Sequence, residues 1–251
     1  MSHPEQLEFM RLARTNLTNS IKHGRILEIG SYDVNGSIRD IFNDGKEYIG
    51  VDLTPGPGVD IVSFGHKLDL ADGYFDLSIS AECFEHDPHW KETFENMVRL
   101  TRPGGVVLFT CASSGRPEHG TTRSDPTLSP GTQTLGLDYY KNLNQADFET
   151  SIQLKDMFQI YKFWYLKNHG DLYFMGWRTT HSTDSEPINV PNDTEVLSIS
   201  KLMSLPHRLI RIPLRITSNL LPESKFQSFA SSYWKNMTRL QEKFFGGRFS
   251  R

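Results

Sequence analysis

Two short apolar stretches near the N-terminus constrain the fold of this 251-residue chain more than any other feature. Residues 26–30 read ILEIG and lead into a turn of small and polar residues, and residues 48–53 read YIGVDL. Short apolar runs bounded by turn residues are typical of buried strands. Glu28, Gly30 and Asp52 are therefore predicted at neighbouring strand ends, an arrangement that builds a nucleoside pocket in open α/β sheets.

Further along the chain, predicted strands alternate with predicted helices. The last two strands are rich in aromatic residues and flank the turn at residues 167–170, which predicts an antiparallel hairpin. The whole pattern predicts a Rossmann-like, doubly wound α/β sheet of seven strands, mainly parallel, with helices on both faces. The expected strands are 25–29, 47–53, 59–63, 75–80, 106–111, 158–165 and 171–177, and the expected helices are 1–20, 37–42, 88–100, 144–155, 202–220 and 223–245.

The same pattern suggests a domain organisation. An N-terminal helix within residues 1–22 is expected to pack on a main domain at residues 23–178. Residues 112–143 are rich in Ser, Thr, Gly and Pro, and a compact domain keeps such a long segment only as a functional lid or as disorder. We favour the lid. Residues 179–251 are predicted to form a polar linker and a basic C-terminal extension.

Composition argues against several functional classes. The formal charge of −3 and the isoelectric point near 6.3 lack the basic footprint of a nucleic-acid-binding protein. The first twenty residues lack the apolar core of a signal peptide, and no window approaches the roughly 20 apolar residues of a spanning helix. Cys83 and Cys111 fall in or near predicted core strands, where a thiol packs as a small apolar group. We expect a reduced, cytoplasmic protein without nucleic-acid partners.

The C-terminal region differs in charge from the rest of the chain. Residues 201–251 contain ten Lys or Arg and two acidic residues. Within them, residues 205–216 alternate basic and apolar side chains, a pattern suited to an anionic membrane surface or a partner protein. The alternative is that the apolar side chains pack on the domain while the cations stay solvated.

Four motifs in this order resemble the class I S-adenosylmethionine-dependent methyltransferases, of the type 11 kind, across residues 20–177. They are LEIGSYDVNGS, YIGVDL, FDLSISAECFEHDPHW and LTRPGGVVLFT. The ordered set makes the resemblance specific, since each motif alone is weak. It implies S-adenosylmethionine as cofactor and methyl transfer as activity. Tyr32 and Val34 stand where the family commonly has glycines, so the first turn should take a different course.

The residues themselves suggest how such a cofactor would be held. Asp52 can accept two hydrogen bonds from ribose hydroxyls, and turn amides after Gly30, near a helix N-terminus, can receive the methionine carboxylate. By resemblance, Leu53 lies against the adenine, Gly65 and His66 border its polar edge, and Ala81 and Glu82 supply a carbonyl near the methionyl amino group. The predicted cofactor-binding residues are Glu28, Gly30, Ser31, Asp52, Leu53, Gly65, His66, Ala81 and Glu82.

The acceptor side of the site carries histidines and tyrosines. His86 follows the fourth expected strand and can take a proton near neutrality, as can His119 at the start of the lid. Tyr139 and Tyr140, near the end of the lid, are candidate acceptor-binding residues. Anchoring and packing are the alternative roles for all four.

A metal site is not expected from this sequence. Glu85, His86, Asp87 and His89 resemble a ligand cluster, yet consecutive loop residues rarely satisfy one ion, and the sequence shows no distant partner for them.

The sequence therefore predicts methyl transfer from S-adenosylmethionine to a small-molecule or glycan acceptor, at a hydroxyl oxygen. Two alternatives stay open at this point: a nicotinamide-dependent Rossmann oxidoreductase, and a cofactor-binding scaffold protein without catalysis. The oxidoreductase expects Gly-x-Gly-x-x-Gly directly after the first strand, and residues 30–36 do not provide that pattern.

Overall fold

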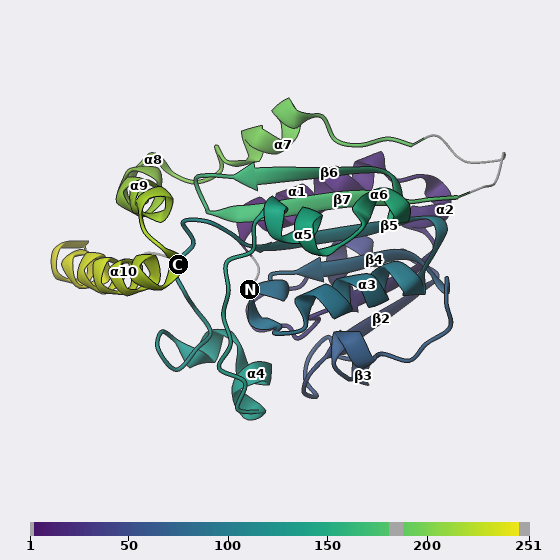
Figure 1. Ribbon diagram of the computed structural model, residues 1–251, viewed down its shortest axis with the longest axis horizontal. Coiled ribbons are helices and arrows are strands. Elements are labelled where there is room, and N and C mark those ends of the chain that lie inside the picture. Colours follow the sequence, from purple (N-terminus) through teal and green to yellow (C-terminus); the bar gives the residue numbers. More distant parts are fainter. Residues whose placement is uncertain (1–2, 181–187, 246–251) are drawn as a thin grey trace.

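A seven-stranded sheet runs through the middle of the computed structural model, which describes residues 3–180 and 188–245 (Figure 1). The strand order is β3-β2-β1-β4-β5-β7-β6. Neighbours from β3 to β5 pair in parallel, whereas β7 is antiparallel to both β5 and β6. The predicted fold class, a mainly parallel doubly wound sheet with a C-terminal antiparallel hairpin, is confirmed.

The strands are β1 (Arg25–Ile29), β2 (Glu47–Asp52), β3 (Ile61–Val62), β4 (Phe75–Ala81), β5 (Thr101–Ala112), β6 (Phe158–Leu166) and β7 (Asp171–Arg178). The α-helices are α1 (Pro4–Asn16), α2 (Asn19–Lys22), α3 (Trp90–Leu100), α4 (Pro130–Thr134), α5 (Gln145–Ser151), α6 (Leu154–Met157), α7 (Asp193–Ile199), α8 (Leu205–Ile210), α9 (Ile212–Leu220) and α10 (Glu223–Phe245). Short 3-10 helices are η1 (Arg39–Phe42), η2 (Gly65–Lys67), η3 (Phe84–His86) and η4 (Pro126–Leu128).

Helices cover both faces of the sheet, and each face has its own core. On one face, α3, α5 and α6 pack over the strands, and Phe94, Phe109 and Phe148 form a buried aromatic stack (Figure 1). On the other face, α1, η1 and α7 bury Phe9, Phe42 and Val196 against the sheet. Burial on both sides explains why β5 reads as a continuous apolar run at residues 106–109.

Several helix predictions need correction. The expected helix at residues 37–42 is only the single 3-10 turn η1, because the preceding turn extends to Ile38. The expected N-terminal helix is two helices, separated where Leu17 takes an extended backbone. The expected helix at residues 144–155 is likewise divided into α5 and α6 at Ile152, which also has an extended backbone.

Two other segments differ from the sequence-based prediction. The expected turn at residues 101–105 belongs to β5, with a shift in register against β4. The polar segment predicted as a linker contains α7, whose Asp193 accepts a hydrogen bond from Trp164 Nε1 at 2.8 Å. Val196 and Ile199 are its buried residues, so a single apolar stripe holds this helix on the sheet.

The expected helix at residues 202–220 is two helices, α8 and α9, because Pro206 and Pro213 each stand in the first turn of a helix. The expected helix at residues 223–245 is α10. Leu214, Phe226, Ala230 and Trp234 pack together into a small separate core. Other apolar side chains of α8 and α9 are exposed, namely Leu205, Leu209, Ile216 and Leu220. Contact of this surface with a membrane or partner protein stays a prediction. Within residues 3–180 and 188–245, no helix has the length and apolar character needed to cross a bilayer.

Candidate functional site

A pocket opens at the carboxyl ends of β1, β2 and β4, the edge of a parallel sheet where ligands bind in this class of fold. One wall comes from the strand ends and from η2, and the other comes from the segment predicted as a lid. The lining residues are Ile29, Gly30, Tyr32, Val34, Val51, Asp52, Leu53, Ser63, Phe64, Gly65, Ala81, Glu82, Cys83, His86, Asp87, Pro88, Leu128, Ser129, Pro130, Gly131, Thr132 and Leu137.

Asp52 stands at the end of β2 with its carboxylate anchored on both sides. One carboxylate oxygen accepts the amide N–H of Tyr32 at 3.0 Å, and the other accepts the N–H of Leu53 at 2.7 Å. Burial raises the pKa of Asp52, while these two amide hydrogen bonds act in the opposite direction. Each oxygen keeps a further lone pair. The carboxylate is thus held rigidly in a pocket where hydroxyl donors can reach it.

The turn after β1 is closed by its own backbone hydrogen bonds. The amides of Gly30 and Ser31 both donate to the Val51 carbonyl, at 2.9 and 3.1 Å. Gly30 has a φ of 83°, and a Cβ there would lie 2.6 Å from the Cβ of Cys83, so only glycine fits. The predicted helix N-terminus at this turn is wrong, because a non-helical stretch separates the turn from η1.

The 3-10 turn η2, between β3 and β4, supplies another part of the wall. Gly65 lines the pocket, and its carbonyl accepts a hydrogen bond from Asn96 Nδ2 at 2.8 Å, which ties η2 to α3. His66 lies outside the lining residues, with its ring centroid 4.2 Å from that of His89.

Glu82, just after β4, has a strained backbone. Its φ of 53° makes it the only non-glycine residue with a positive φ in the described part of the chain. Such a conformation costs about 1–2 kcal/mol for a side chain of this size. The residue lines the pocket, yet its carboxylate is fully buried and pairs with His3 and Arg116, each at 3.9 Å.

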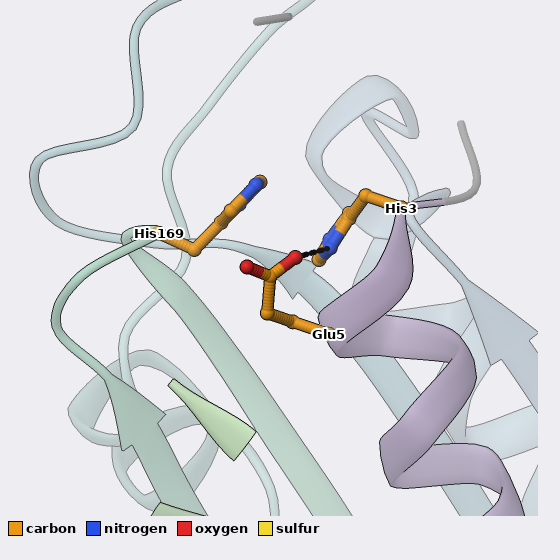
Figure 2. Close-up of side chains that lie close together, drawn as sticks. All are labelled: His3, Glu5 and His169. Atoms are coloured by element: carbon orange, nitrogen blue, oxygen red, sulfur yellow. Dashed lines mark hydrogen bonds and ion pairs between the residues drawn. The ribbon is translucent and has the colours of Figure 1, made fainter. Parts of the chain in front are cut away.

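That carboxylate belongs to a buried charge cluster behind the pocket, made by His3, Glu5, Glu82, Arg116, His169 and Asp171. Figure 2 shows three of its members, with Glu5 reaching from α1 toward His3 and the His169 ring. The His3 and His169 rings stack with centroids 3.9 Å apart. The cluster therefore joins the start of α1, the end of β4, the lid segment and the turn between β6 and β7.

Arg116 is the cation around which this cluster is built. Its guanidinium lies 3.3 Å from Asp171 and also contacts His169. Burial lowers the pKa of Arg116, but the charges of Asp171 and Glu82 outweigh burial and raise it. The pKa of His3 is also raised: burial lowers it, but the hydrogen bonds to Asp171 and Glu5 and the charges of Asp171 and Glu82 together outweigh burial.

The predicted catalytic and acceptor-binding residues gather on one side of the pocket. His86 lines it, whereas His119, Tyr139 and Tyr140 lie outside the lining residues. The Tyr140 ring packs against both histidines, and its hydroxyl donates to Asn142 at 2.9 Å. Burial lowers the pKa of His86 to about 3 and that of His119 well below its usual value, so both imidazoles are neutral at pH 7.

Lid residues around α4 form the part of the wall that individual sequence predictions missed. Ser129, Pro130 and Gly131 face the strand ends, and a Cβ on Gly131 would lie 3.0 Å from Asp52 Oδ1. A serine followed by proline is a helix-start signal and would have revealed α4. Its docking against Asp52 depends on tertiary packing.

Glu28 does not line the pocket; it lies buried in β1. The Tyr48 hydroxyl donates to its carboxylate at 2.7 Å. Burial raises its pKa from 4.5 to about 7 despite that hydrogen bond. The folded chain thus holds a proton that the unfolded chain releases, and the free energy of unfolding should fall as pH rises from 4.5 to about 7.

Glu28→Gln should remove this dependence. Relative to the unmodified chain, the variant should gain roughly 2–3 kcal/mol of unfolding free energy between pH 4.5 and 8, measured by urea denaturation. Glu47→Gln is a matched control, because Glu47 accepts from Tyr74 at 2.8 Å in a partly exposed position. Parallel pH curves for Glu28→Gln and the unmodified chain would contradict the assignment.

Comparison with known proteins places this site in a family. Residues 27–109, from β1 into β5, match the family described as "Methyltransferase domain". An uncharacterized methyltransferase from Mycobacterium sp. (strain JLS) is 34% identical over 76 residues, covering 26% of this chain and 30% of the relative. A second, from Mycobacterium ulcerans (strain Agy99), is 33% identical over 78 residues, covering 26% and 31%. The chain thus aligns with less than a third of the length of either curated relative.

A solved structure extends the likeness of the fold. The YcgJ protein from Bacillus subtilis has a TM-score of 0.50 and 15% identity, covering 71% of this chain and 100% of that protein. The ordered motifs, the strand order and the family match agree. Residues 27–109 are therefore similar to a methyltransferase domain, within a sheet that has the Rossmann-like fold.

Proposed function

We propose that the pocket binds S-adenosylmethionine through Asp52 and that the chain transfers the methyl group to a hydroxyl of a small-molecule or glycan acceptor. The observation that carries this proposal is the Asp52 carboxylate, fixed by two amides inside the pocket at the end of β2. An ionised acceptor of this kind forms strong hydrogen bonds to the two hydroxyls of a ribose.

The other predicted contacts follow the same pocket wall. Gly30, Leu53, Gly65, Ala81 and Glu82 line it and are proposed to hold the cofactor. Ser31, His66 and Glu28 lie outside the lining residues, and their proposed part is to support the turn and the strands. Apolar lining from Ile29, Leu53 and Phe64 suits an adenine ring.

The lid covers this site, and an enclosed site favours a small acceptor. Residues 128–132 and Leu137 form the wall opposite the strand ends, so an acceptor would be enclosed with the cofactor. In the proposed reaction the acceptor oxygen attacks the methyl carbon, the sulfur–carbon bond breaks with its electron pair going to sulfur, and the hydroxyl proton passes to water. Alignment of the reactants provides much of the acceleration in such a displacement.

His86 is the proposed acceptor-side residue, because it lines the pocket and the other three candidates do not. The other three candidates are proposed to act indirectly, by packing around His86. They are His119, Tyr139 and Tyr140.

A transfer assay tests this function. Purified protein is incubated with S-adenosylmethionine carrying a labelled methyl group and with panels of hydroxylated small molecules and glycans. We expect label in at least one acceptor, at a hydroxyl oxygen by mass spectrometry, and a large loss of turnover in His86→Ala. His89→Ala, an exposed histidine of the same loop, is the control. Label on nitrogen or carbon would contradict O-methylation, and full turnover in His86→Ala would contradict its role.

A further inference from the structure

Three buried side chains beside the pocket bring metal-binding atoms together. Glu85 and His86 belong to η3, and His119 comes from the lid segment. One ligand atom from each lies within 4.8 Å of the others, and the three side chains are buried. Residues 85–89 alone do not predict a metal site. His119 is the distant partner for Glu85 and His86 that only the structure shows.

The polar atoms of this group lack the partners that buried groups normally have. Neither carboxylate oxygen of Glu85, nor His86 Nδ1, has a hydrogen-bond partner among residues 3–180 and 188–245. An unpaired buried carboxylate is expensive, and buried charges in proteins are usually paired or bound to metal. Three unpartnered polar atoms at one point therefore form a site that a cation can occupy.

The two imidazoles are oriented as metal ligands are. His119 Nδ1 lies 3.2 Å from the Pro117 carbonyl, so a donating Nδ1–H leaves Nε2 with its lone pair 3.8 Å from Glu85 Oε1. The His86 ring is held by the Tyr139 backbone, which leaves Nδ1 unpartnered. A backbone carbonyl on the far ring nitrogen is the usual outer contact of a metal-bound histidine.

The geometry also suits a small ion. Two ligand atoms about 2.1 Å from a tetrahedral ion lie about 3.4 Å apart, close to the 3.8 Å between His119 Nε2 and Glu85 Oε1. Gly120 leaves room beside His86, since a Cβ there would lie 2.7 Å from its Cε1 and 3.4 Å from its Nδ1.

The neighbouring charge cluster provides a contrast. Its groups His3–Glu5–His169 and His3–Glu82–Asp171 also bring ligand atoms together. There, however, the Arg116 guanidinium contacts Asp171 and His169 and already supplies the positive charge. No lysine or arginine is paired with Glu85 in the described part of the chain.

We propose that Glu85, His86 and His119 bind one divalent first-row transition-metal ion of the zinc class, with water at the remaining position. Two imidazoles and one carboxylate favour such an ion over magnesium or calcium, which prefer oxygen ligands. The ion connects η3 with the lid segment and holds the lid beside the pocket.

The test uses tagless, full-length protein stripped with a chelator. Binding of Zn²⁺ is measured by competition with a chromophoric chelator, and melting temperature is followed with and without Zn²⁺. We expect one equivalent bound at sub-micromolar Kd and a higher melting temperature with Zn²⁺. Mn²⁺ and Mg²⁺ are run in parallel, and tighter binding of Mg²⁺ than of Zn²⁺ would overturn the assigned ion class.

Two variants identify the ligands. Glu85→Gln keeps the shape of the side chain and His119→Ala removes one imidazole; each should weaken Zn²⁺ binding at least about 100-fold, since outer contacts alone contribute about 10–100-fold. His89→Ala should bind as the unmodified chain does. Circular dichroism of the metal-free proteins checks folding. Absence of Zn²⁺ binding to the unmodified chain, or unchanged affinity in a folded Glu85→Gln, would overturn the proposal. S-adenosylhomocysteine binding to the metal-free protein is measured separately, so the proposed function is judged independently.

Discussion

Replacing Arg116 with methionine should lower the free energy of unfolding by about 3–5 kcal/mol, the range found when one partner of a buried ion pair is removed. The guanidinium is buried and lies 3.3 Å from Asp171 and 3.9 Å from Glu82. Methionine fills similar space but leaves those two buried carboxylates without their guanidinium partner. Urea denaturation at pH 7, with two-state behaviour checked by two probes, measures the loss.

Arg123→Met is the matched control for this prediction. Arg123 lies in the same lid segment and pairs with Glu118 and Asp138, but its side chain is 54% exposed. Exposed pairs contribute up to about 1 kcal/mol because water screens them. Similar losses in the two variants would show that the buried charge cluster does not stabilise the fold in the way its geometry indicates.

The second large effect concerns ligand binding. Asp52→Ala should weaken binding of S-adenosylhomocysteine, the demethylated cofactor, about 100-fold or more. Two hydrogen bonds to an ionised carboxylate together contribute about 3 kcal/mol or more. Isothermal titration calorimetry measures the change. The amides of Tyr32 and Leu53 lose their acceptor in this variant, so its melting temperature must be recorded as well.

Two further variants separate a ribose contact from general damage. Asp69→Ala removes an exposed aspartate just beyond η2 and should bind the ligand normally. Gly131→Ala keeps Asp52 intact but adds a methyl group 3.0 Å from its Oδ1, so it should weaken binding in a stable fold. Unchanged affinity in a folded Asp52→Ala would reject the ribose contact.

The strands could be predicted from the sequence because their physical signal is local. A strand covered on both faces is mostly apolar along its length, and residues 106–109 of β5 carry that signal directly. The aromatic hairpin could also be predicted, because Gly170 marks the turn between its two strands. In the structure Gly170 has a φ of 85°. Helices with weak apolar stripes were harder: α7 buries only Val196 and Ile199, so its composition resembles that of a linker.

The candidate site could be predicted only in part, because some of its contacts join segments that are distant in the sequence. Asp52 and Gly30 stand at strand ends, and their shared edge follows from parallel pairing of β1 and β2. The contacts of His119 with Glu85, and of Asp171 with Arg116 and His3, join segments far apart in the chain. Such contacts depend on how the lid and α1 pack, and no periodicity in the sequence encodes them.

Calorimetric titration of the unmodified chain with S-adenosylmethionine, S-adenosylhomocysteine and NAD tests the central claim most directly. The account predicts that both sulfur-containing ligands bind with one ligand per chain and that NAD does not bind. Binding of NAD without either sulfur-containing ligand would contradict it and would favour an oxidoreductase.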